Sequence, residues 1–355
     1  MRGLFHRAAV TADGSAGRLR WTTATPVGLV MGLGLCLGLL APAPSAVAGP
    51  AVAAPRVTAT IKVGKAPVGV AVNPQTNTVY VTNFSGNTVS VISGQTNKLT
   101  ATVRVGTEPV GVAVNPKTNT IYVANFQAHT MSVISGRTNT VTTTVTFAGA
   151  TRYVAVNPQT NTIYVTNFNT VSVINGQTNK VTATIPTGMF KILAGVAVNA
   201  QTNTIYVTSF TSTRMSVISG RTNKVTATIP VGTGQYGVAV NPVTDTAYTA
   251  NSGNTVSVIR GQTNKVTATV RVGSGPSGAA VNPQTNTIYI TNYGSSRTPG
   301  NTVSVISGRT NKVTATVQVG SGPSGLAVNP QTNTAYVTNY GSSTAPGNTV
   351  SVISG

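Results

Sequence analysis

The chain has 355 residues and a formal net charge of +20, from 23 Lys and Arg against 3 Asp and Glu. Only 7% of residues are charged, so the positive balance reflects missing acids, and no basic run of the kind found in disordered tails is present. The Val-, Thr- and Asn-rich composition favours strands and turns over helices. A hydrophobic content of 40% is enough for a sizeable core at this length.

The N-terminal residues predict a secretory signal peptide over residues 1–48. Four arginines precede a 14-residue apolar run at 27–40, and Ala46-Val47-Ala48 supplies a small-residue cleavage site. The run is too short to span a bilayer comfortably, and an uncleaved membrane anchor is the alternative. A second cleavage site would follow Ala53, and residues 49–56 are predicted to be a short linker. We therefore expect a secreted, extracellular or cell-surface protein.

Cysteine usage sets a further limit. Cys36 is the only cysteine, and it lies inside the apolar run, where the preceding Leu35 is too large for lipoprotein processing. After cleavage the chain can form no disulfide, no thiolate nucleophile and no Cys-ligated metal site. Its stability must then come from its core and its topology.

A short pattern recurs seven times along the chain. It first reads Val70-Ala71-Val72-Asn73-Pro74, and its Asn returns at 115, 157, 199, 241, 282 and 329, at intervals of 41 to 47 residues. Each copy contains four strand-like pieces separated by turns, and in the first copy these are 69–72, 78–82, 88–92 and 98–105. Four short antiparallel strands at this period are typical of a propeller blade. Helical solenoids share the period, but the β-branched runs argue against helices.

The two ends of the repeat region predict how the ring closes. A strand at 57–63 precedes the first copy, and the last copy stops after its third strand. If the N-terminal strand becomes the fourth strand of the last copy, all seven copies are complete four-stranded blades. Such closure removes the open edge that an all-β chain must otherwise protect. We therefore predict a single all-β domain at 57–355, a seven-bladed β-propeller with four antiparallel strands per blade.

A four-residue motif marks the second strand of each copy. It first reads Tyr80-Val81-Thr82-Asn83, and close variants begin at Tyr122, Tyr164, Tyr206, Tyr248, Tyr289 and Tyr336. The motif resembles the YVTN β-propeller repeat family of bacterial and archaeal surface or periplasmic proteins, and the resemblance covers 57–355. It implies the propeller fold but no particular function, because one fold hosts many functions. The third strands depart from the family by ending in Val-Ile-Ser-Gly, where an acidic residue often follows Val-Ile.

Antiparallel alternation divides the loops between two faces of the predicted disc. The turns after the first and third strands of each blade lie on one face, called the turn face. The loops after the second and fourth strands lie on the other, called the top face. Basic residues gather on the turn face, with Lys117 and Arg260 beside the main set and Asp245 as the one opposing charge. The main set is Lys98, Arg137, Lys180, Arg221, Lys224, Lys265, Arg309 and Lys312.

Two interpretations of this basic set are open. Solvated turn residues keep a disc soluble, whereas a basic ring attracts an anionic polymer such as a cell-wall polymer, an acidic lipid or non-specific nucleic acid. The sequence contains no recognition helix, RNP motif or zinc finger, so sequence-specific nucleic-acid binding is not expected.

The top face collects aromatic residues. Six of them directly follow the second-strand motif and are expected to pack over the blades: Phe84, Phe126, Phe168, Phe210, Tyr293 and Tyr340. The loops entering blades three to five instead hold non-repeated residues. An aromatic ring beside a guanidinium suits a sugar ring, an acidic saccharide or a peptide end. The predicted ligand-binding residues are therefore Arg152, Tyr153, Phe190, Lys191 and Tyr236.

Catalytic chemistry is sparse after cleavage of the leader. Glu108 and His129 are both expected on the top face. The alternative prediction is therefore a lactonase-like hydrolase or lyase in which these two residues are the acid–base pair. With no second carboxylate there, a metal site of ordinary ligand count cannot be assembled. Asp245 stands at a turn position. The main prediction is a non-enzymatic, monomeric binding or scaffold module for an anionic polymer, glycan or protein, with no cofactor, no metal and no membrane span in the mature chain.

Overall fold

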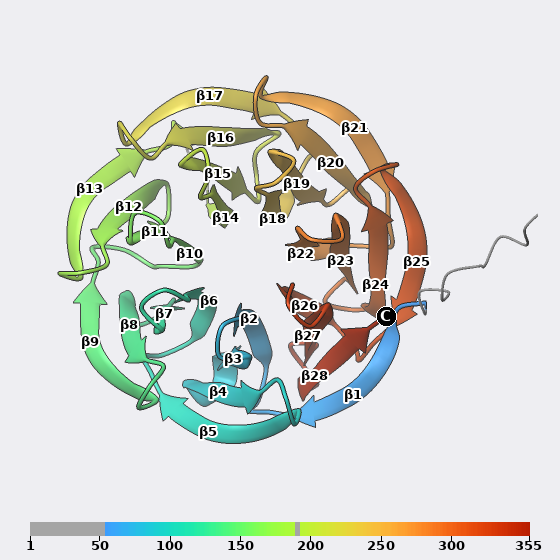
Figure 1. Cartoon of the computed structure of the whole chain (residues 1–355), viewed down its shortest axis with the longest axis horizontal. Coiled ribbons are helices and arrows are strands. Elements are labelled where there is room, and N and C mark those ends of the chain that lie inside the picture. The colour runs from blue at the N-terminus through green and yellow to red at the C-terminus, as the bar shows by residue number, and fades with distance from the viewer. Residues whose placement is uncertain (1–53, 189–191) are drawn as a thin grey trace, which may run out of the picture. The chain divides into compact units, whose positions relative to one another are not determined.

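The computed structural model describes residues 54–188 and 192–355. The predicted signal peptide and residues 49–53 of the predicted linker lie outside the described residues. The described chain forms 28 strands in seven four-stranded antiparallel sheets, which confirms the predicted seven-bladed β-propeller (Figure 1). One 3-10 turn, η1 (Phe84–Gly86), is the only helical element among these residues.

In every blade the first strand lies nearest the central axis and the fourth forms the rim (Figure 1). The inner strands are β2 (Pro67–Asn73), β6 (Pro109–Asn115), β10 (Val154–Asn157), β14 (Leu193–Asn199), β18 (Gln235–Asn241), β22 (Pro276–Asn282) and β26 (Pro323–Asn329). The second strands are β3 (Thr78–Asn83), β7 (Thr120–Asn125), β11 (Thr162–Thr166), β15 (Thr204–Ser209), β19 (Thr246–Asn251), β23 (Thr287–Gly294) and β27 (Thr334–Gly341).

The third and outer strands complete the blades. The third strands are β4 (Thr88–Ser93), β8 (Thr130–Ser135), β12 (Thr170–Asn175), β16 (Arg214–Ser219), β20 (Thr255–Arg260), β24 (Pro299–Ser307) and β28 (Pro346–Ser354). The outer strands are β5 (Lys98–Arg104), β9 (Thr140–Thr146), β13 (Lys180–Pro186), β17 (Lys224–Pro230), β21 (Lys265–Arg271), β25 (Lys312–Gln318) and β1 (Arg56–Lys62). Blade one is β2–β5 and the next five follow in chain order, whereas blade seven joins β26, β27 and β28 to β1.

The N-terminal strand closes the ring as predicted. β1 pairs antiparallel with β28, with Ile61 opposite Val350, and the blue strand lies along the red one in Figure 1. Ile61 and Val63 are buried in a core cluster with Tyr336, Val350 and Val352. Pairing in blade seven therefore covers the edge of β28 and adds apolar burial, so closure stabilises the ring in two ways.

The apolar core lies between neighbouring blades. Tyr80 and Val81 are adjacent on β3, so their side chains point to opposite faces of the sheet. Tyr80 packs with Ile121 of blade two, and Val81 packs with Val350 of blade seven. Both side chains are almost completely buried. The Tyr and Val of the repeated motif thus pack each blade against both of its neighbours.

The Asn of the motif fixes the top-face end of each blade. In blade one, Nδ2 of Asn83 donates hydrogen bonds to Oγ1 of Thr88 and Oγ of Ser90, both at 2.9 Å. Gly64 of the preceding loop lies against this side chain, and a Cβ there would come within 2.5 Å of Asn83 Cγ. The repeated Tyr-Val-Thr-Asn motif is therefore explained by packing and hydrogen bonding, and its repetition carries no catalytic information.

A ring of side-chain hydrogen bonds joins the blades on the turn face. In each blade the last residue of the inner strand donates from Nδ2 to an Oδ1 in the first turn of the next blade, at 2.7–2.8 Å. The acceptors have a positive φ of 48–53°, a conformation that Asn and Asp tolerate. They are Asn119, Asn161, Asn203, Asp245, Asn286, Asn333 and Asn77. Asp245 is therefore confirmed as a turn residue, and it also accepts the inter-blade bond from Asn199.

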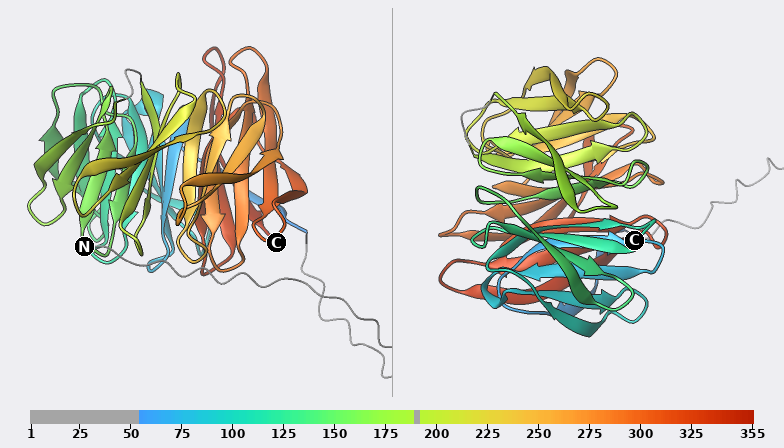
Figure 2. Two further views of the ribbon diagram at one scale, coloured as in Figure 1. Left: turned by 90° about the horizontal axis from the view of Figure 1, so that it is seen from above. Right: turned by 90° about the vertical axis from the view of Figure 1, so that its left-hand side faces the viewer.

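Figure 2 shows the strands crossing the thickness of the propeller, with loops gathered on its two faces. Two top-face hairpins are longer than the rest. β23 and β24 pair as far as Gly294 and Pro299, and β27 and β28 pair as far as Gly341 and Pro346. These adjacent hairpins belong to blades six and seven, so the top face is asymmetric although the repeat is regular.

Candidate functional site

The wall of the central channel is built around the third residue of each inner strand. A Cβ at Gly69 would lie 2.2 Å from the carbonyl oxygen of Val110 in the next blade. Neighbouring inner strands therefore approach more closely there than a side chain allows, and glycine is needed. Six blades have glycine at this position: Gly69, Gly111, Gly195, Gly237, Gly278 and Gly325.

Threonine, the third letter of the repeated motif, ties these strands together across blades. Oγ1 of Thr82 accepts a hydrogen bond from the backbone N of Gly69 and donates one to the carbonyl of Val110, both at 2.8 Å. The same pair of bonds recurs in blades four, six and seven at Thr208, Thr291 and Thr338. The channel wall is thereby a fixed frame for the loops above it.

Blade three departs from this frame at Tyr153, which stands where the other blades have glycine. Its inner strand β10 has four residues, whereas the other inner strands have seven. The backbone N of Tyr153 still donates to Oγ1 of Thr166 at 3.0 Å. The preceding residue, Arg152, accepts a bond through its carbonyl from the N of Gly111 at 2.9 Å. Hydrogen bonds to blades two and three therefore position both residues at the channel.

The Arg152 guanidinium lies over two of the repeated top-face aromatic rings. Its Cζ is 5.1 Å from the ring centroid of Phe126 and 4.8 Å from that of Phe210. The Phe210 ring meets Tyr236 edge-on, with centroids 4.8 Å apart and planes 75° apart. Cation–π attraction to these two rings stabilises the guanidinium of Arg152 in this position. The four side chains form one continuous row from blade two to blade five.

The guanidinium of Arg152 has no hydrogen-bond partner among the described residues. The bonds that Arg152 makes run through its backbone, and its Nε is buried without an acceptor. A buried donor left unpaired is unfavourable by about 1–3 kcal/mol, and by more when it is charged. The two Nη groups are not buried in this way, since Arg152 as a whole is only half-buried, so a ligand could bind to them.

A cavity of about 560 Å³ opens among these residues at the channel mouth on the top face. Its walls come from all seven inner strands and from the top-face loops. Three of the predicted ligand-binding residues, Arg152, Tyr153 and Tyr236, line it together, and Arg152 is the only charged residue among the described residues that do so. The predicted residues Phe190 and Lys191 lie outside the described residues.

Four of the repeated aromatics also line this cavity: Phe84, Phe210, Tyr293 and Tyr340. The sequence predicts that they pack over the blades, because periodic aromatics usually belong to a core. Tyr293 and Tyr340 instead stand side by side, with ring centroids 6.4 Å apart. Their shared position directly after the second-strand motif is the sequence signal for this role. Phe168 remains 58% exposed and is not part of the lining.

Burial favours the neutral form of two phenols that line the cavity, those of Tyr153 and Tyr293. Burial raises the pKa of Tyr153; Arg152 partly opposes this shift, and Tyr236 adds to it. Burial also raises the pKa of Tyr293, with further contributions from Tyr340 and Tyr236. A neutral phenol both donates and accepts hydrogen bonds, so the cavity offers several such groups around a single cation.

Glu108 and His129 are the acid–base pair of the alternative, enzymatic prediction. Glu108 and His129 both lie on the top face, each with a φ of 54° in its own turn. The N–H of Glu108 donates to Oδ1 of Asn87, while the carbonyl of His129 accepts from the N of Phe147. No hydrogen bond or ion pair links the two residues within 54–188 and 192–355. Both residues are in blade two, where each makes a backbone hydrogen bond to Phe126.

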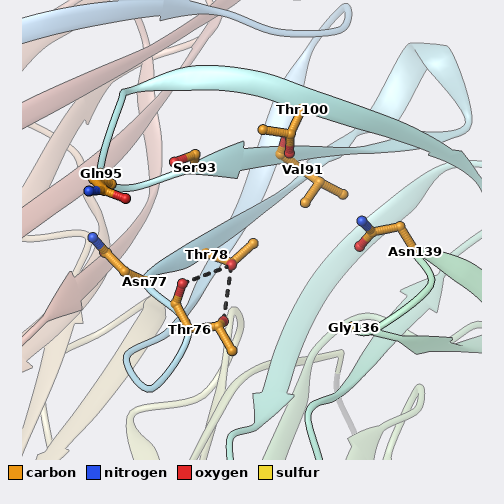
Figure 3. Close-up of a pocket in the computed structure, with 9 residues that line it drawn as sticks. All are labelled: Thr76, Asn77, Thr78, Val91, Ser93, Gln95, Thr100, Gly136 and Asn139. Carbon is orange, nitrogen blue, oxygen red and sulfur yellow. Dashed lines mark hydrogen bonds between the residues drawn. The ribbon is translucent and has the colours of Figure 1, made fainter.

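The eight residues of the predicted basic set are all exposed, as are Lys117 and Arg260. The eight lie in or directly after the turns between third and outer strands, so they lie toward the rim of the turn face. A second cavity, of about 460 Å³, opens between the turns of blades one and two on this face (Figure 3). Uncharged residues line it, including Thr76, Thr78 and Asn139, and the repeat supplies equivalents of most of them in other blades. Nothing in its lining is particular to one blade.

Neither a metal-binding cluster nor a membrane-spanning helix is found in the described part of the chain. Across residues 54–188 and 192–355, no three His, Cys, Asp or Glu side chains converge in a way that could hold a metal ion. No helix in the same ranges is long and apolar enough to cross a membrane.

Comparison with known proteins places the chain by its fold. No family model matches the sequence, and no curated protein matches it. Among solved structures, the chain is similar to one of Kuenenia stuttgartiensis hydrazine synthase, with a TM-score of 0.71 and 18% identity over 82% of this chain and 96% of that chain. At this identity the likeness shows the fold alone. The class of protein that fold and comparison define is a seven-bladed β-propeller.

Proposed function

We propose that the chain is a secreted or cell-surface, non-enzymatic binding module that takes its specific ligand in the channel-mouth cavity. The observation that carries the proposal is the unpartnered guanidinium of Arg152 inside a cavity of about 560 Å³. That volume lies within the range of small-molecule and glycan sites, which are concave and mostly apolar with a few fixed polar groups. An acid–base role for Glu108 and His129 has no comparable support.

Membership of the YVTN repeat family is part of this proposal. It is supported by the seven copies of the motif, from Tyr80-Val81-Thr82-Asn83 onward, and by the structural role of each letter. The exposed basic set supports a second, less specific property, attachment of the turn face to anionic polymers through long-range attraction. The leader-like residues 1–48 support export.

The proposal is tested with an array of neutral glycans, acidic glycans and polyanions probed by the purified protein. We expect one class to bind, and binding to be lost in the double variant Tyr153→Ala/Tyr236→Ala. The matched control is Phe168→Ala, which removes an exposed aromatic ring from the same face outside the cavity. Specific binding that survives the double variant would place the site elsewhere and refute the proposal.

A further inference from the structure

The charge of the cavity limits the charge of its ligand. Arg152 is the only charged residue among the described lining residues, and burial raises the pKa of Tyr153 and Tyr293 further above the physiological range. A ligand with one negative charge balances the guanidinium. A dianion would leave a second charge unpaired in a confined site, which is strongly unfavourable. A neutral ligand would leave the guanidinium without a charged partner.

The surroundings of the guanidinium favour a carboxylate over other monoanions. Phe126 and Phe210 lie against the group and its Nε is buried, so the two Nη groups are the donors that a ligand can reach. These two Nη groups form a planar fork that matches the two oxygens of a carboxylate.

The remaining walls suit a hydroxylated ring. Tyr236, which is 40% exposed, and Phe210 stand nearly perpendicular and present apolar ring surface to the cavity. Tyr153, Tyr293 and Tyr340 also line the cavity, and a phenol both donates and accepts hydrogen bonds. Several amphipathic phenols beside aromatic faces match a pyranose, which carries apolar C–H faces and a rim of hydroxyls.

Resting on the proposed function, we infer that the channel-mouth cavity binds a sugar acid, a pyranose carrying one carboxylate, with the carboxylate held by Arg152 and the ring held by Tyr236 and Phe210. The sugar acid is either free or the terminal unit of an acidic polysaccharide. Both sources present the same chemistry to the cavity.

The test measures binding of D-glucuronate to the full-length protein by titration calorimetry and saturation-transfer NMR. Methyl D-glucuronate keeps the shape without the charge, D-glucose lacks the carboxyl group, and glucose 6-phosphate tests a dianion. We expect D-glucuronate to bind about 10- to 100-fold more tightly than the ester or glucose, the range for loss of hydrogen bonds to a charged group. Glucose 6-phosphate is expected to bind more weakly than glucuronate.

Variants assign the carboxylate to its partner. Arg152→Gln is expected to weaken glucuronate binding about 10- to 100-fold and ester binding much less, and Arg152→Lys to cause an intermediate loss of glucuronate binding. The matched control is Arg297→Gln, which removes the same charge from an exposed position on the same face and should change neither. If Arg152→Gln does not fold, the comparison of acid with ester in the wild type still decides.

The failures are distinguishable. Equal binding of glucose and glucuronate, lost in Tyr153→Ala/Tyr236→Ala, overturns the sugar-acid inference and keeps the proposed function. Tighter binding of glucose 6-phosphate, or no binding of glucuronate while the array yields another ligand, also overturns it. Glucuronate binding that is insensitive to Arg152→Gln overturns the role of Arg152. A disaccharide ending in glucuronate separates the sources: tighter binding than the monosaccharide assigns the site to a chain end, and weaker binding assigns it to the free sugar acid.

Discussion

Nδ2 of Asn329 donates a hydrogen bond of 2.8 Å to Oδ1 of Asn77, and this contact closes the ring of seven bonds on the turn face. The two residues are 252 positions apart in the sequence, yet they repeat the geometry of neighbours such as Asn73 and Asn119. The last inner strand therefore meets the first blade in the same register as every other pair of blades.

Replacing Asn329 by Ala is expected to lower the free energy of unfolding by about 1–3 kcal/mol, because a buried donor is removed and Oδ1 of Asn77 keeps no donor. The side chain also accepts a bond from the N of Gln331, which disappears too. Urea unfolding followed by circular dichroism measures the change. Asn301→Ala, at an exposed Asn outside the ring, is the control. Equal midpoints for the two variants would mean that the ring adds no stability.

Deleting residues 1–63 should destabilise the propeller, whereas deleting residues 1–48 should leave its melting temperature unchanged. The longer deletion removes the buried side chains of Ile61 and Val63, worth about 1.5–3 kcal/mol each. It also exposes the edge of β28, which favours aggregation. Thermal melts with light scattering compare the two proteins. The same melting temperature in both would show that β1 contributes nothing to closure.

Binding of the turn face to a polyanion should weaken steeply with salt. Heparin and duplex DNA are suitable probes, and for DNA the slope of log affinity against log salt changes by about 0.9 for each phosphate that the protein no longer neutralises. Changing Lys98, Lys180, Lys265 and Lys312 to Gln should flatten the slope with little effect on melting, because exposed charges add little stability.

The matched control for that experiment removes the same charge from the other ends of the outer strands. The four control positions are Lys62, Lys65, Arg104 and Arg271, all exposed. We expect their Gln variant to keep the wild-type salt slope. Absence of polyanion binding at low salt, or equal slopes for both sets of variants, would argue that the basic set only keeps the disc soluble.

The propeller should lose stability at alkaline pH through its motif tyrosines. Burial raises the pKa of Tyr164, Tyr206 and Tyr248 to about 12, with Asp245 also raising that of Tyr206. An unfolded chain ionises its tyrosines near pH 10, so it holds fewer protons than the folded chain between about pH 10 and 12. Stability is therefore fully retained below that window and falls as pH rises through it.

The measurement is the urea midpoint as a function of pH, together with the absorbance of tyrosinate. Tyr164→Phe should reduce the alkaline loss of stability, because one group with a raised pKa is gone. A folded protein in which every tyrosine ionises together near pH 10 would refute this prediction.

The strands are predictable because the repeat is strict and each strand is bounded by turn residues. The inner strand of blade one is predicted at 69–72, whereas β2 begins at Pro67, which pairs with Asn83 across a register shift. A shift of this kind breaks the alternating pattern on which the prediction rests. Strand existence and type are therefore accessible from the sequence, and strand ends are less so.

The candidate site is predictable in part. Arg152, Tyr153 and Tyr236 interrupt the repeat on the top face, which is the basis for predicting them, and they line one cavity. The stacking of Arg152 on Phe126 and Phe210 depends on side-chain rotamers in three blades, which no sequence pattern specifies. Glu108 and His129 show the converse limit: the repeat places both in one blade and on one face, but it does not specify whether their side chains bond to each other.

The pairing of β1 with β28 also determines when the ring can close during synthesis of the chain. β1 leaves the ribosome before any other strand of the propeller, and its partner follows only after six complete blades have been made. Until then the growing chain is an open arc of blades. The strand edges exposed at its two ends resemble those that drive misassembly. The propeller thus stays vulnerable to aggregation and proteolysis for nearly the whole of its synthesis, and a chaperone that shields strand edges would be most useful just before β28 emerges.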